Sequence, residues 1–139
     1  MDLLRAQNSI KNALEGAGIT LKYELTEKHL NAKGTLRSEK TGDFLFTVAV
    51  YPGKSNTASC SMYFNELPST PRVNQLLNDF NKNAYLLHAC EDEFLVLEHT
   101  GCRINEQDVG QYVLDIINEL ADEEVLSLLI PLINEAQNN

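Results

Sequence analysis

The stretch DFLFTVAVYPGKSNTASCSMYF, residues 43–64, contains two runs of alternating apolar and polar side chains separated by a turn sequence. Alternation with a period of two is typical of a strand that buries one face and leaves the other in water. The intervening PGKS, residues 52–55, favours a tight turn. The stretch therefore predicts an antiparallel hairpin. Its apolar members are Phe44, Phe46, Val48 and Val50 in the first run and Ala58, Cys60, Met62 and Phe64 in the second.

Further alternating runs lie on both sides of this hairpin. Residues 30–36 alternate in the same way, and SEKTG, residues 38–42, is a second turn sequence, so the prediction extends to a three-strand meander with one wet face. Residues 19–26 also alternate and are interpreted as a further strand. Downstream, residues 84–90 and 94–100 are predicted to form a second hairpin.

Helical periodicity appears in the segments between and after these strands. Residues 3–17 carry an apolar stripe at helical spacing. Thr70 is suited to cap a short amphipathic helix that has Pro71 at its first position. Residues 105–120 show the clearest stripe, and Asp122 is suited to cap a separate last helix.

These elements predict the α+β class, with an antiparallel sheet (three-strand meander plus hairpin) and helices packed on one face of it. The expected order is α-β-β-β(-β)-α-β-β-α-α. We expect residues 1–120 to form the α+β domain. Residues 121–139 are expected to form an apolar helix that packs on this domain or in a dimer interface.

The charge of the chain is −9 and is unevenly distributed. Residues 91–139 hold twelve acidic residues and a single base, Arg103. Such a surface disfavours nucleic acids and anionic membranes, which need clustered lysine and arginine. A basic or amphipathic protein partner is expected instead. No apolar run is long enough to span a bilayer, and the polar N-terminal residues do not resemble a signal peptide, so we expect a cytoplasmic protein.

The stretch HACEDEFLVLEH, residues 88–99, is the part of the chain that looks most like a chemical site. We interpret it as a hairpin with a three-residue acidic loop, in which His99 faces away from His88. The alternative is a small metal- or thiol-dependent regulator or enzyme that uses His88 and Cys90. In this alternative, Glu98 and Cys102 would complete the site beside His88 and Cys90. The other cysteine, Cys60, alternates with apolar residues and is expected to be buried, so we expect no catalytic residue, metal or cofactor.

The last helix carries more apolar side chains than one small core needs. It therefore caps its own domain, builds a homodimer, or binds a client protein. Pro131 predicts a kink or an early stop near Ile130. The residues expected to contact a partner are Val125, Leu126, Leu129, Ile130, Leu132 and Ile133.

The element order resembles that of type III secretion chaperones and the similar YbjN-like bacterial proteins. The local match covers residues 76–120, where a short helix with Asn81, a strand, an acidic turn, a strand and a long amphipathic helix follow one another. The resemblance implies a non-enzymatic, chaperone-like homodimer that binds an extended segment of another protein. Client contacts would come from the outer positions of the meander and from the last helix. The family pattern has no such helix after Leu120.

Overall fold

The computed structural model describes residues 2–54, 56–84 and 87–137. These residues form four helices and a six-stranded antiparallel sheet with the strand order β1-β2-β3-β4-β6-β5, so the predicted α+β class and element order are confirmed. The elements are α1 (Leu3–Glu15), β1 (Lys22–Leu25), β2 (Leu30–Leu36), β3 (Phe44–Tyr51), β4 (Thr57–Glu66), α2 (Pro71–Asn83), β5 (His88–Asp92), β6 (Phe94–Arg103), α3 (Val109–Glu119) and α4 (Glu123–Gln137).

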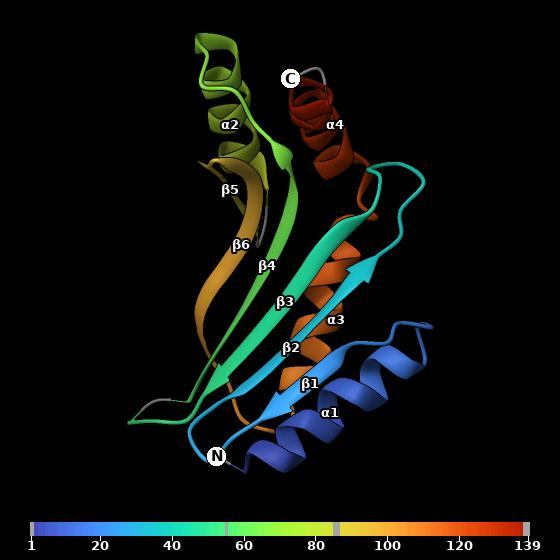
Figure 1. Ribbon diagram of the computed structural model, residues 1–139, viewed down its shortest axis with the longest axis vertical. Helices are drawn as coiled ribbons and strands as arrows, with labels where there is room; N and C mark the ends of the chain where they lie inside the picture. The colour runs from blue at the N-terminus through green and yellow to red at the C-terminus, as the bar shows by residue number, and fades with distance from the viewer. Residues whose placement is uncertain (1, 55, 85–86, 138–139) are drawn as a thin grey trace.

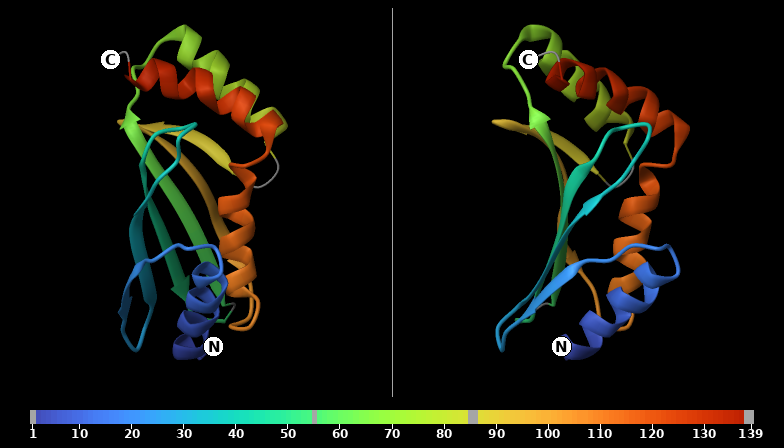
Figure 2. Two further views of the ribbon diagram at one scale, coloured as in Figure 1. Left: turned by 90° about the vertical axis from the view of Figure 1, so that its right-hand side faces the viewer. Right: turned by 45° about the vertical axis from the view of Figure 1, so that its right-hand side comes forward.

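The helices of the described chain all lie on one face of the sheet, and the opposite face is uncovered (Figure 1, Figure 2). Two helix pairs share the covered face. At one end α1 packs against α3, and at the other α2 packs against α4. None of the described helices is long and apolar enough to cross a membrane.

The covered face of the sheet carries the apolar half of each alternating run. The strand registers place Phe46 opposite Met62 and Met62 opposite Leu97, and all three side chains are fully buried. The other half of each run faces outward. Hydrophobic burial on one face therefore fixes the register, because a slip by one residue would exchange the two faces.

The third helix begins later than the sequence indicated. It starts at Val109 rather than Asn105, because Asn105 forms a turn whose side-chain oxygen accepts hydrogen bonds from the backbone N–H groups of Gln107 and Asp108 at 3.0 Å each. Asp108 precedes the helix without a side-chain capping bond. The cap instead comes from α1, where Ser9 Oγ accepts from the Gly110 N–H at 3.0 Å.

Of the two outcomes expected from Pro131, a kink or an early stop near Ile130, the early stop is wrong. Helix α4 continues through Pro131 to Gln137. The carbonyl that loses its donor to Pro131 belongs to Ser127, which is exposed, so water can satisfy that carbonyl. Leu129 and Leu132, on either side of the proline, are fully buried and hold the helix against the domain.

The second hairpin exists, but its predicted register is wrong by two residues. Cys90 lies opposite Val96 rather than Phe94, and the turn centres on Glu93, which adopts a positive φ of 62°. The ladder therefore extends closer to the turn, as far as the pairing of Asp92 with Phe94. The two faces are preserved by this shift, and the predicted strand positions Tyr85 and Leu86 lie outside the described residues.

Candidate protein-binding site

The last helix packs into the core of its own domain. Of the six residues expected to contact a partner, Val125, Leu126, Leu129, Leu132 and Ile133 are buried. Ile130 is half-buried. An ion pair between Arg72 Nε and Glu135 Oε1, 2.7 Å apart, joins α2 to α4 at the surface. In this conformation α4 caps the domain, and its buried side chains are not on the accessible surface.

The residues of the alternative chemical site do not gather in one place. His88 lies directly opposite Glu98, and Cys90 is two residues along on the same open face. Cys102 pairs with the buried Ala58 and so lies on the covered face. Among the residues that the structure describes, no three His, Cys, Asp or Glu side chains converge as metal ligands.

A polar cluster on the covered face was not foreseen from the sequence. His99 Nδ1 lies 2.8 Å from Tyr112 Oη, and the Tyr112 hydroxyl also interacts with the Cys60 thiol. Burial raises the pKa of Cys60 to about 12, so the thiol stays protonated and is a poor nucleophile. The sequence indicated which face each residue occupies. It did not indicate that Cys60, His99 and Tyr112, which are far apart in the sequence, would come into contact. The cluster gives the Tyr112 hydroxyl and the Cys60 thiol polar partners on the covered face.

The two edges of the sheet differ in what they leave open. At β5, Asn81 of α2 donates from Nδ2 to the Ala89 carbonyl at 2.8 Å and accepts from the Ala89 N–H at 2.6 Å. This pair of bonds takes the place of a neighbouring strand, so the edge is closed at Ala89.

The other edge, β1, pairs only with β2 among the described strands. The Thr26 N–H donates to the His29 carbonyl at 3.0 Å, which fixes the phase of the ladder. Because hydrogen-bonded and non-hydrogen-bonded pairs alternate in an antiparallel ladder, the backbone N–H and C=O groups of Tyr23 and Leu25 point away from β2. They are directed toward the edge, where another strand could bond to them.

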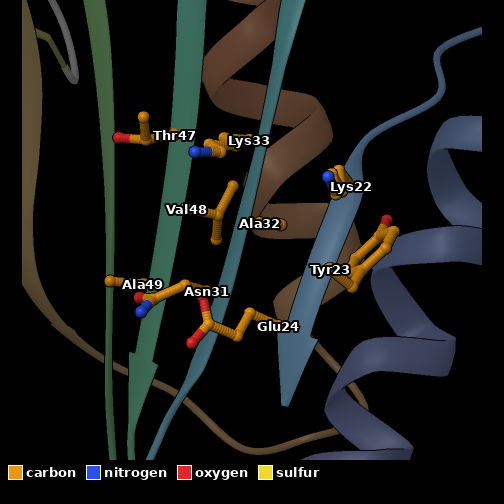
Figure 3. Close-up of a pocket in the computed structure, with 9 residues that line it drawn as sticks. All are labelled: Lys22, Tyr23, Glu24, Asn31, Ala32, Lys33, Thr47, Val48 and Ala49. Carbon is orange, nitrogen blue, oxygen red and sulfur yellow. The ribbon is translucent and has the colours of Figure 1, made fainter.

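A groove of about 820 Å³ runs along this edge between β1 and α1. Its volume is in the range of ligand pockets, about 300–1,000 Å³. Apolar side chains from the β1 side, including Ile19 and Tyr23, line one wall, and polar side chains of α1 line the other. Lys11 Nζ lies 5.0 Å from the centre of the Tyr23 ring, which projects toward α1 (Figure 3). Leu25 at the end of the groove is 41% exposed.

The uncovered face of the sheet is a second accessible surface. A hollow of about 510 Å³ lies over β1, β2 and β3, where Lys22, Lys33 and Thr47 form one row (Figure 3). Beyond it, Leu45 and Tyr63 lie directly opposite each other on β3 and β4, and both are exposed. This face has the outer meander positions that the resemblance assigned to client contacts.

Comparisons with protein-family models, with curated proteins and with solved structures gave no match. The resemblance to secretion chaperones therefore stays an expectation. The interpretation of the two surfaces rests on their geometry and chemistry.

Proposed function

We propose that this protein is a non-enzymatic, chaperone-like binding module that takes up an extended segment of a partner protein as an additional strand along β1. The observation that carries the proposal is the open β1 edge beside a groove with one apolar wall, on a sheet whose other edge is closed at Ala89 by Asn81. Strand addition gains affinity from main-chain hydrogen bonds and specificity from pockets for alternate side chains.

The lining of the groove indicates the chemistry of the bound segment. Side chains on one face of the added strand would lie against Tyr23 and Leu25, so apolar residues are expected at alternate positions. Side chains on its other face would lie in water beside Lys22 and Glu24, which are both exposed. The charge of −9 on the chain favours segments that are not themselves strongly acidic.

The metal- or thiol-dependent alternative has weaker support. His88, Cys90 and Glu98 share a face, but Cys102 lies on the other face of the sheet. The Cys60 thiol, which is close to a histidine and a tyrosine, is held protonated by burial, which raises its pKa.

Selection of displayed short random peptides against the full chain tests the proposed function. We expect enriched sequences with apolar residues at alternate positions, and we expect Leu25→Lys to weaken their binding about tenfold or more, or roughly 1.4 kcal/mol. A lysine there places a charge at the groove and discourages edge pairing. Binding is measured by titration with fluorescence anisotropy.

Leu45→Lys is the matched control for this experiment. Leu45 is 41% exposed, as Leu25 is, but it lies on the uncovered face away from the groove. Peptides should therefore bind Leu45→Lys as they bind the unaltered chain. If no peptide is enriched, or if enriched peptides bind Leu25→Lys with unchanged affinity, the assignment to β1 is refuted.

A further inference from the structure

The uncovered face of the sheet carries a row of side chains that crosses all its described strands. The registers place Lys22 opposite Lys33, Lys33 opposite Thr47, and Thr47 opposite Ser61. Ser61 in turn lies opposite Glu98 on β6, and Glu98 lies opposite His88 on β5, where the row ends. One end of the row is therefore basic, the middle is small and neutral, and the other end carries an acid.

The two lysines at the basic end are cross-strand neighbours. Like charges directly opposite each other on a sheet destabilise it, unless a counter-charge lies nearby. Lys33 and Glu98 carry opposite charges but are separated by three strand spacings, roughly 14 Å. They are therefore too far apart to form an ion pair within one chain.

The row is complementary in charge to the same row of a second copy that runs in the opposite direction across the strands. A two-fold axis that runs along the boundary between β3 and β4 exchanges β1 with β5 and β2 with β6 in the strand order. Stacking the face on a second copy about this axis places Lys33 over Glu98 of the other copy, twice. In the middle it places Thr47 over Ser61, and these small side chains allow the sheets a close approach.

Two features of the face agree with this arrangement. The exposed pair Leu45 and Tyr63 straddles the same β3–β4 boundary, so the axis brings each onto the other in the second copy. The hollow beside Lys22 and Lys33 lies where the Glu98 side chain of the second copy would enter.

We propose that this protein forms a symmetric homodimer through the uncovered face of its sheet, with reciprocal Lys33–Glu98 ion pairs and an apolar centre at Leu45 and Tyr63. Strand spacing and rise give the face roughly 600 Å² in projection, comparable with the ~800 Å² per partner of a standard interface. Sheets that pack face to face keep their strands within about 30° of each other. The reversed charge order favours a second copy of this chain over an unrelated partner.

This dimer is independent of the proposed peptide site, because the β1 edge lies at the border of the face. It also differs from the dimer expected through the last helix, whose apolar residues are occupied in the core. Each proposal can therefore fail without the other.

Charge exchange measured by sedimentation velocity tests the dimer. The unaltered chain should sediment with twice the chain mass of 15.6 kDa. Lys33→Glu alone and Glu98→Lys alone should each sediment as the monomer. An equimolar mixture of the two variants should recover the dimer, because two attractive ion pairs then form between the unlike chains. One of them is the original Lys33–Glu98 pair, and the other has its charges exchanged. The double variant should also dimerise.

Two further variants complete the design. Leu45→Lys should give the monomer, whereas the equally exposed Leu25→Lys outside the face should leave the dimer intact. Circular dichroism confirms that each variant is folded before its mass is interpreted. A monomeric unaltered chain, or a dimer that tolerates both single charge reversals, overturns the proposal, as does failure of the mixture to recover the dimer.

Discussion

An alanine at Gly110 is expected to destabilise the fold by about 3 kcal/mol, at the upper end of what overpacking usually costs. A Cβ atom at this position would clash with the backbone oxygen of Ser9, so α3 and α1 would have to move apart. The shift would also disturb Ser9 Oγ, which accepts from the Gly110 N–H and donates to the Gln107 carbonyl. Urea denaturation followed by circular dichroism measures the loss.

Gly16→Ala is the control for this substitution. Gly16 has an ordinary helical φ of −62°, and the nearest atom to a new Cβ is the Ala13 carbonyl oxygen at 3.9 Å. Alanine there should be neutral or should stabilise the protein by about 0.4–1 kcal/mol through the unfolded chain. Equal effects of the two substitutions would show that α1 and α3 do not approach as closely as described.

Leu132→Ala is expected to cost about 2–5 kcal/mol of unfolding free energy, the range for removing a large side chain from a packed core. Leu132 in α4 is fully buried, and the helix packs against α2, β4 and β6. The loss includes both the transfer of the side chain and the cavity that remains. Thermal and urea denaturation of the full chain measure it.

Ile130→Ala is the comparison within the same helix. Ile130 is only half-buried, so its truncation should cost clearly less than that of Leu132. If α4 instead packed only against a partner protein, Leu132→Ala would leave the stability of the isolated chain almost unchanged. That result would return the last helix to the role of a binding surface.

The element order could be predicted because each element has its own local periodicity of apolar and polar side chains. Phe44 to Val50 and Ala58 to Phe64 alternate strictly, and each run became a strand with the predicted face inward. Thr70 caps α2 as expected, since its Oγ1 accepts from the Val73 N–H at 3.1 Å. These features depend on residues that are close together in the sequence, so a single sequence is enough to predict them.

The binding surfaces could not be predicted in the same way, because they depend on which strands become neighbours. Strand β4 pairs with β6 rather than β5, so the hairpin is inserted with β5 at the edge. That order creates the Lys22-to-His88 row and brings Asn81 against Ala89. The surplus of apolar residues in α4 correctly indicated burial, but its composition alone left open what would cover it.

Hydrogen exchange of individual backbone amides, measured by NMR with and without a selected peptide, tests the central claim most directly. In the free protein the amides of Tyr23 and Leu25 should exchange quickly, while the Glu24 amide, bonded to β2, is protected. With peptide bound, Tyr23 and Leu25 should become protected, because their N–H groups then bond to the added strand. Fast exchange at both residues in the saturated complex would contradict strand addition at β1.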